Sequence, residues 1–301
     1  MRIWIAAVVP AILLGVSAFI AQPAPAQAVK PPACLIPSVK NVRMFDAFNA
    51  IGKPDLSSYG MQRVQVLDRD FWADNKRKTA DPARVEKLLT TLPNNNDPIV
   101  LDIEHFDTSN DPAVTRKEGV ALAQIARIFR QKAPGRSIGF YGLLPTAGWG
   151  DSIVRGDLRN IATWKQHNDA MAPLNSVVDV LYPVGYTINK DRAAWAKQMR
   201  STICEARRIS KRPVYVFVWP EFHEGSVFKN TPIPADQWRT QLDVLAPIAD
   251  GIVLWGGYDL VKNRLKSWDE DEPWWAVTKE RMARWKRNGR PAYSGPATKP
   301  I

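Results

Sequence analysis

Seven short apolar runs, rich in Val, Ile, Phe and Tyr, recur along the chain and are separated mostly by amphipathic segments. The runs are continuous rather than alternating, which is typical of strands buried on both faces of a parallel sheet. They occupy residues 41–48, 63–71, 98–106, 137–144, 177–186, 213–219 and 251–256.

Helical patterns lie between most of these runs. Asp-Pro pairs at 81–82 and 111–112 each indicate an N-cap followed by proline in the first helical position. The second of these helices is expected to bury Val120 together with Ile125, Ile128 and Phe129. Only the connection at 52–61 lacks a clear helix. Further helices are predicted at 160–172, 192–210, 235–245 and 274–286.

Strands that alternate with helices predict one α/β domain with a parallel sheet. No glycine-rich turn follows the first strand, so a dinucleotide-binding fold has no support. In a barrel, catalytic side chains come from the C-terminal ends of several strands. Polar and aromatic residues gather at these ends, and we therefore predict a distorted parallel (β/α) TIM-like barrel of about seven strands. The residues are Asp68, Asp70, Trp72, Asp102, Glu104, Tyr141, Tyr182, Tyr186, Trp219, Glu221, Trp255 and Tyr258.

Two carboxylates end the third apolar run at the spacing i, i+2. Side chains two apart on a strand point the same way, so Asp102 and Glu104 should share one face. Mutual repulsion would raise the pKa of one of them, as general acid catalysis near neutral pH requires. The alternative is a solvated strand end, or pairing of both groups with Arg and Lys.

The N-terminus has the pattern of a secretory signal peptide. Arg2 is the only charged residue in the first 28, an apolar stretch follows it, and Ala26 and Ala28 frame a cleavage site. An uncleaved membrane anchor is the alternative. We expect a signal peptide at 1–28, a catalytic barrel at 29–290 and a basic flexible tail at 291–301. The mature protein would be secreted or periplasmic, with no stable membrane span.

The formal net charge of +11 falls to +10 without Arg2 and is concentrated near the C-terminal end. A basic surface favours polyanions, although a solvated helix face with a loose tail explains this one better, and no nucleic acid partner is predicted. The two cysteines, Cys34 and Cys204, could form a disulfide in an exported protein, but the sequence cannot show that they meet. Neither a metal site nor a cofactor is predicted, because metal-ligand spacings are absent.

Twelve tryptophans are many for this length. Four of them fall at or just past strand ends, where their faces could stack on sugar rings: Trp72, Trp149, Trp219 and Trp255. Ordinary packing explains most tryptophans in proteins. We expect one or two of the four to touch ligand.

Five segments resemble the hyaluronidase family of glycoside hydrolases, the bee venom and mammalian type. They occur in family order at similar spacing and extend from about Val42 to Tyr258. They are LDIE at 101–104 (the family's D-x-E), IGFYG at 138–142 (G-x-Y-G), LYPVGY at 181–186 (L-Y-P-x-x-Y), PVYVF at 213–217 (P-V-x-x-Y/F) and GIVLWG at 251–256 (G-x-V-x-W-G). The family fold is a distorted barrel, usually described with seven strands.

The resemblance implies a substrate-assisted retaining mechanism on a β-linked glycan with a 2-acetamido sugar, outside the two-carboxylate scheme. Glu104 would protonate the leaving oxygen and then activate water. Asp102 would raise the pKa of Glu104 and orient the acetamido group, and Tyr182 would hydrogen-bond the acetamido oxygen. Trp255 would wall the pocket behind the methyl group. Further substrate contacts are predicted for Asp68, Tyr141, Tyr186, Trp219 and Phe222.

The chain also departs from the family. The second family tyrosine aligns best with Phe222, which has no hydroxyl group, and His105-Phe106 replaces the family's flank after the catalytic Glu. The predicted substrate is therefore an N-acetylhexosamine-containing polysaccharide, either hyaluronan-like or a cell-wall or exopolysaccharide. Two alternatives stay open. One is a barrel glycosidase with a carboxylate nucleophile such as Glu221 or Asp259, and the other is a non-catalytic glycan-binding barrel.

Overall fold

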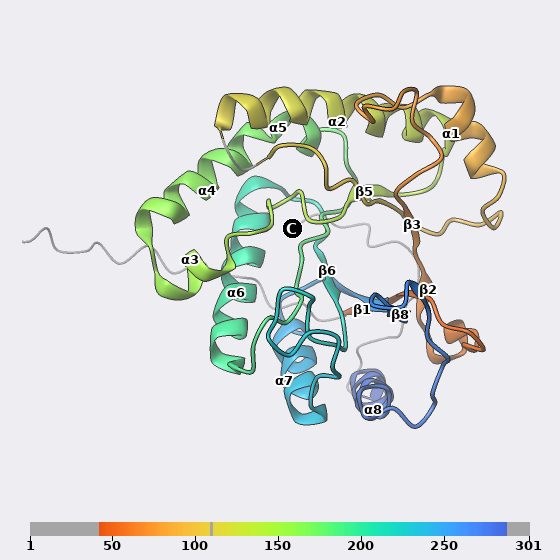
Figure 1. Cartoon of the computed structure of the whole chain (residues 1–301), viewed down its shortest axis with the longest axis vertical. Helices are drawn as coiled ribbons and strands as arrows, with labels where there is room; N and C mark the ends of the chain where they lie inside the picture. The colour runs from red at the N-terminus through yellow and green to blue at the C-terminus, as the bar shows by residue number, and fades with distance from the viewer. Residues whose placement is uncertain (1–41, 109–110, 288–301) are drawn as a thin grey trace, which may run out of the picture. The chain divides into compact units, whose positions relative to one another are not determined.

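The computed structural model describes residues 42–108 and 111–287, whose parallel strands are arranged in a ring (Figure 1). Strand pairing continues round this ring. One sheet has the order β2-β1-β7-β6 and a second has the order β3-β4-β5. β2 and β3 are two halves of one strand interrupted at Val64, so they connect the sheets on one side. The strands are β1 (Arg43–Phe48), β2 (Gln62–Arg63), β3 (Gln65–Leu67), β4 (Ile99–Leu101), β5 (Ile138–Phe140), β6 (Tyr215–Val218) and β7 (Gly251–Gly256).

The predicted fifth strand, residues 177–186, closes the ring between β5 and β6. It does so through isolated parallel bridges from Leu181, Tyr182 and Val184 rather than a regular ladder. Pro183 lies in the middle of this segment and has no N–H to give to a ladder, which explains the irregularity. The prediction of a distorted parallel barrel with about seven strands is thus confirmed.

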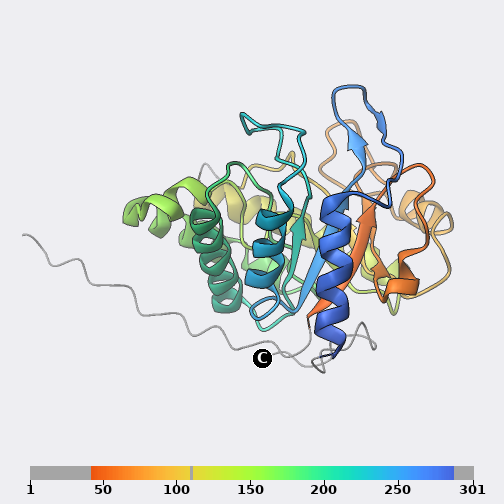
Figure 2. The ribbon, with the colours of Figure 1, turned by 90° about the horizontal axis from the view of Figure 1, so that it is seen from below.

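Helices cover the outside of the ring. In Figure 2, α6, α7 and α8 lie side by side along the strands β6, β7 and β1. The predicted helices are present within a few residues, whereas the short α3 and α5 and the hairpin of β8 (Tyr258–Asp259) and β9 (Arg264–Leu265) were not predicted. The helices are η1 (Leu56–Tyr59, a 3₁₀ turn), α1 (Pro82–Leu89), α2 (Pro112–Lys132), α3 (Gly150–Arg155), α4 (Leu158–Ala170), α5 (Ala172–Asn175), α6 (Arg192–Ile209), α7 (Ala235–Leu245) and α8 (Pro273–Arg287).

The two Asp-Pro helix starts are built as the sequence predicts. The side chain of Asp81 accepts hydrogen bonds from two N–H groups in the first turn of α1, and Asp111 does the same for α2. One expectation for α2 is wrong: Val120 is 44 % exposed, whereas Ile125 and Phe129 are buried. Val120 lies five residues before Ile125, so it projects from a different side of the helix.

Two apolar clusters stabilise the barrel. The larger one lies between strands and helices, and the smaller one fills the inside of the ring with alternate residues of the strands, among them Phe45, Val100, Tyr182 and Phe217. The aromatic side chains inside the barrel leave no space for a side chain at Gly139. A Cβ atom added at Gly139 would come within 2.4 Å of the Val180 carbonyl oxygen and 2.6 Å of the Tyr182 ring.

The predicted boundaries at 28/29 and 290/291, the signal peptide, the basic tail and Cys34 all lie outside the described residues. Cys204, on α6, is disulfide-bonded. Within residues 42–108 and 111–287, no helix is long and apolar enough to cross a membrane. The same residues contain no group of three or more His, Cys, Asp or Glu side chains that could hold a metal ion.

Gly139→Ala should destabilise the protein by about 1–3 kcal/mol, because the added methyl group has no space inside the ring. Urea denaturation would measure the change in the free energy of unfolding. Gly119→Ala is the matched control, since its Cβ would first meet the flexible Met171 side chain at 3.3 Å. Alanine also favours the helix there, so we expect little loss. Equal losses for both variants would contradict this account of the barrel interior.

Candidate active site

The site begins where three adjacent strands end. The N–H of Asp102 donates to the Leu67 carbonyl oxygen at 2.9 Å, and the N–H of Tyr141 donates to the Leu101 carbonyl oxygen at 3.1 Å. These bonds continue the pairing of β3, β4 and β5 by one residue. Asp68, Asp102 and Tyr141 therefore follow one another round the C-terminal end of the ring, as the sequence predicts.

Asp102 is the carboxyl group that the fold changes most. Burial, then the charge of Glu104 and then the charge of Asp68, raise its pKa from 3.8 to about 7. Its Oδ1 atom is buried and has no hydrogen-bond partner among the described residues. A buried carboxyl oxygen without a partner is costly, so this atom is suited to a ligand group. Of the two carboxylates at spacing i, i+2, the raised pKa falls on Asp102.

Glu104 is exposed, and the chain after it is anchored to another loop. The Nε2 atom of His105 lies 2.7 Å from the Arg77 carbonyl oxygen, and the His105 ring contacts Trp72. Phe106 is buried beneath Lys78, whose Nζ atom lies 3.9 Å from the ring centre. His105 and Phe106, the two residues that differ from the hyaluronidase pattern after the catalytic Glu, thus hold the loop that carries Glu104 in place.

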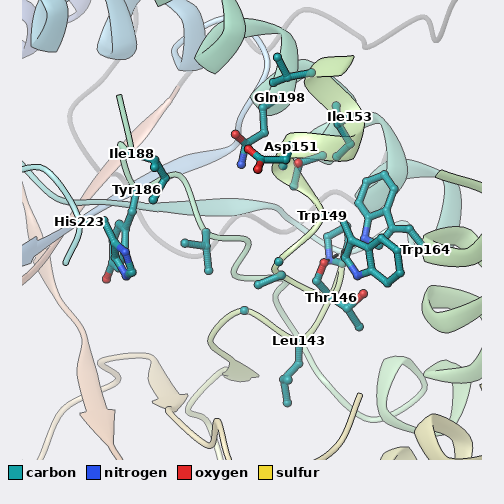
Figure 3. A pocket seen from close by; sticks show the side chains of 18 of the residues that line it. Leu143, Thr146, Trp149, Asp151, Ile153, Trp164, Tyr186, Ile188, Gln198 and His223 are labelled. Carbon is teal, nitrogen blue, oxygen red and sulfur yellow. Dashed lines mark hydrogen bonds between the residues drawn. The ribbon is translucent and has the colours of Figure 1, made fainter. Parts of the chain in front are cut away.

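Two cavities open beside the carboxylates and share Glu104, Tyr141, Tyr186 and His223 in their walls. The small cavity, of about 200 Å³, is also lined by Asp102, Trp219, Glu224 and Trp255. The large cavity, of about 620 Å³, extends along the loop before α3 and the start of α6, past Trp149, Asp151, Trp164 and Gln198. Figure 3 shows Tyr186 and His223 together at one side of the large cavity and the paired rings of Trp149 and Trp164 at the other.

Tyr141 and Tyr186 lie between the cavities, and their hydroxyl groups hydrogen-bond each other. Burial raises the pKa of both, so both stay protonated at any ordinary pH. When one hydroxyl donates to another, the acceptor keeps a hydrogen of its own to donate elsewhere. The pair can therefore offer one O–H group to a ligand.

Aromatic rings form another part of the lining of the small cavity. Trp219 and Trp255 meet edge to face with ring centres 5.0 Å apart, and Tyr186 packs against both. Trp219 is 2 % exposed, yet its Nε1 atom has no hydrogen-bond acceptor among the described residues. Of the four tryptophans at strand ends, Trp149, Trp219 and Trp255 line the cavities. Trp72 instead packs on Phe71.

The structure places Tyr182 away from both cavities, contrary to the role predicted for it. The Tyr182 side chain is fully buried, with its ring against Tyr215 and Phe217. Alternate residues of the fifth strand all face into the ring, but Tyr182 comes four residues before Tyr186 and so lies deeper. The tyrosine of this segment that reaches the carboxylates is Tyr186.

Phe222 is also misplaced by the sequence prediction. It is 1 % exposed and packs on Phe228, while its N–H donates to the Thr231 carbonyl oxygen. The next residue, His223, faces the cleft instead. Its Nδ1 atom accepts from the Gly225 N–H at 3.1 Å, which leaves Nε2 as the donor of the ring.

The remaining predicted residues lie at or beyond the rim. Asp68 is exposed beside Arg69 and lines neither cavity, although its charge contributes to the pKa of Asp102. Glu221 forms an ion pair of 2.6 Å with Lys266, and the Asp259 side chain accepts from the Lys262 N–H in the β8–β9 hairpin. Neither alternative nucleophile lines the cavities.

Sequence reasoning missed His223, Glu224, Asp151 and Gln198 as cavity residues. The first two follow Pro220 in a turn whose direction the sequence does not show. Asp151 belongs to the six-residue α3, which is too short to give a periodic signal. Of the residues in this wall, the sequence analysis named Trp149, as one of the four tryptophans at or just past strand ends.

Comparison with known proteins supports the fold. No protein-family model matches the chain, and no curated protein sequence matches it. The chain is similar in fold to bee venom hyaluronidase, with a TM-score of 0.54 at 14% sequence identity over 82% of this chain and 96% of that chain. The crystal structure of bee venom hyaluronidase in complex with hyaluronic acid tetramer gives a TM-score of 0.53 at 14% identity, covering 84% of this chain and 98% of that chain. At this identity the likeness shows the fold, and it confirms the family resemblance at that level.

The raised pKa of Asp102 predicts how stability depends on pH. The folded protein holds the Asp102 proton more tightly than the unfolded chain, so the free energy of unfolding should fall as pH rises from about 4 to about 7. The loss amounts to at most about 4 kcal/mol, for a shift of about three pKa units. Asp102→Asn should remove this loss and be more stable than the wild type at pH 8.

Denaturant unfolding at several pH values between 4 and 8 would measure this difference. Asp151→Asn is the control, because that side chain is 90% exposed. Its stability curve should run parallel to that of the wild type. A parallel curve for Asp102→Asn as well would show that Asp102 holds no proton of raised affinity.

Proposed function

We propose that the protein is an exported glycoside hydrolase that cleaves a β-linked polysaccharide containing N-acetylhexosamine. The observation that carries this proposal is the position of Glu104 in the wall between two cavities. A glycan bound across both cavities would present the oxygen that links its two sugars to Glu104. General acid catalysis needs a carboxyl group at that oxygen.

The mechanism we propose uses the acetamido group of the substrate as the nucleophile. The acetamido sugar occupies the small cavity, where its carbonyl oxygen attacks the anomeric carbon as the bond to the leaving oxygen breaks. Glu104 gives a proton to that oxygen. Water then attacks the anomeric carbon of the cyclic intermediate and gives a proton to Glu104, so the configuration is retained. No protein carboxylate bonds to the sugar.

Asp102 orients the acetamido group in this scheme. Its unpartnered Oδ1 atom can accept from the acetamido N–H, which turns the carbonyl oxygen toward the anomeric carbon. The raised pKa of Asp102 keeps a proton on this carboxyl group, next to Glu104, up to about pH 7. Trp255 forms the wall behind the methyl group, and the hydroxyl pair Tyr141–Tyr186 replaces Tyr182 as the donor to the acetamido oxygen.

The comparisons support a glycosidase at a coarser level than this mechanism. The barrel likeness is to bee venom hyaluronidase, and one of the matched structures of that enzyme holds hyaluronic acid tetramer. Polysaccharide is thus the class of substrate that we propose. The signal-peptide pattern of residues 1–28 supports export, which we also propose.

A carboxylate nucleophile is the second candidate mechanism, and one observation favours it. Glu224 lines the small cavity together with Asp102 and Glu104. It is better placed than Glu221 or Asp259, which lie outside the cavity. A non-catalytic glycan-binding barrel remains the alternative from another class.

Glu104→Gln should lower turnover by about two to four orders of magnitude, because an amide cannot deliver a proton to the leaving oxygen. Glycan binding should survive, since the substitution keeps shape and hydrogen bonding. A reducing-end assay across a panel of acetamido glycans, with calorimetric titration of the variant, would measure both. Turnover equal to that of the wild type would place the acid elsewhere.

A thiazoline mimic of the cyclised acetamido group should inhibit the wild type competitively and far more tightly than substrate binds. It resembles a species close to the transition state, which the enzyme binds best. A 2-fluorosugar is the control, because it traps a carboxylate nucleophile as a covalent adduct. Mass spectrometry that found such an adduct on Glu224, with no inhibition by the thiazoline, would overturn the acetamido mechanism.

A further inference from the structure

The charge of the cleft is opposite to that of the whole chain. The formal net charge is +11. Four carboxyl groups nevertheless line the two cavities: Asp102, Glu104, Asp151 and Glu224. Among the described residues in those walls there is no Lys or Arg. A site for a polymer with a carboxylate on every second sugar would be expected to contain at least one such cation.

Basic side chains border this cleft without lining it. Lys78 lies over the Phe106 ring and pairs with Glu118, and Lys197 donates to the Val154 carbonyl oxygen. Arg155 lies 4.0 Å from Asp151, with both side chains mostly exposed, so the pair is loose and screened. Arg69 pairs with Asp68 outside the cavities. Lys190 lies over the Phe228 ring. The lining itself therefore presents negative charge and aromatic rings.

A second observation indicates that a sugar-sized polar ligand belongs in the small cavity. Trp219 is 2 % exposed and its Nε1 donor has no acceptor among the described residues. Asp102, which lines the same cavity, has an Oδ1 atom without a partner among these residues. One is a donor and the other can accept, which suits the carbonyl and N–H of an acetamido group or the hydroxyl groups of a sugar ring. A uronate in this position would place its charge beside Asp102 and Glu104.

We infer that the substrate is a uronate-free hexosamine polymer that is partly de-N-acetylated. This inference rests on the proposed function. The sugar in the small cavity keeps its acetamido group, which the chemistry requires. A sugar in the large cavity carries a free ammonium group that Asp151 attracts, and the sugar on the other side of the acetamido sugar carries one that Glu224, in the wall of the small cavity, attracts. Hyaluronan, with its regular carboxylates, is repelled by the same groups.

The test compares three polymers by kcat/KM from reducing-end release, at low and at high ionic strength. They are hyaluronan, a fully acetylated β-linked hexosamine polymer, and the same polymer after partial de-N-acetylation. We expect the partly de-N-acetylated polymer to be the best substrate at low salt, with its advantage reduced at high salt by screening. Hyaluronan should be the poorest.

Variants locate the effect. Asp151→Asn and Glu224→Gln, singly and together, should lower the ratio of kcat/KM for the de-N-acetylated over the acetylated polymer by about two- to fivefold for each carboxylate removed. Glu86→Gln removes a carboxylate on α1, where it pairs with Lys132, and should leave the ratio unchanged. The ratio separates charge recognition from a general loss of activity.

The outcomes distinguish the inference from the function on which it rests. Cleavage of hyaluronan as fast as the uronate-free polymers, or a ratio that both variants leave intact, would overturn the inference while the protein remained a glycosidase. Failure to cleave or bind any acetamido polymer would remove the proposed function and the inference with it.

Discussion

Closure of the strand ring is the constraint on which the rest of the molecule depends. Once β7 pairs with β1, and residues 178–184 bridge β5 to β6, every second residue of each strand must face inward. The deeper inward positions hold Phe45, Val100 and Phe217, and the last ones before the loops hold the acid and aromatic side chains. The candidate active site is therefore the top layer of the inner core.

This layering explains what the sequence could predict and what it could not. The apolar run at 98–106 forms a strand only as far as Leu101, so Asp102 and Glu104 lie beyond β4. Both nevertheless line the small cavity, as the spacing i, i+2 predicts. Predicting whether Tyr182 or Tyr186 lines the cleft is harder, because the side chains of both face the inside of the ring. Only the stagger of the fifth strand against β6, visible in the bridge from Val184 to Phe217, shows which of them reaches the cleft.

Residues in loops were harder to place for a related reason. Phe222 and His223 are neighbours, and a turn after Pro220 decides which of them faces the cavity. The turn is held by backbone hydrogen bonds between Phe222 and residues 230–231, a pairing that no local pattern specifies. Asp151 and Gln198 come from α3 and α6 and meet only because the barrel brings these helices together (Figure 3). Fold and acid pair thus follow from periodicity, whereas the walls of the cleft follow from tertiary contacts.

Asp102 shows how the two apolar clusters and the site depend on each other. A partly buried carboxyl group next to two others destabilises the folded protein at neutral pH. The size of this destabilisation follows from the rise in the pKa of Asp102. The same burial lets it hold a proton and leaves its Oδ1 atom without a hydrogen-bond partner among the described residues. A destabilising buried carboxyl group is retained only where many surrounding contacts hold it in place. Here β3, β4 and β5 fix its backbone, and the packed rings below it prevent the strand end from relaxing toward water. The rigid, apolar lower layers are therefore a condition of the chemistry proposed for the top layer.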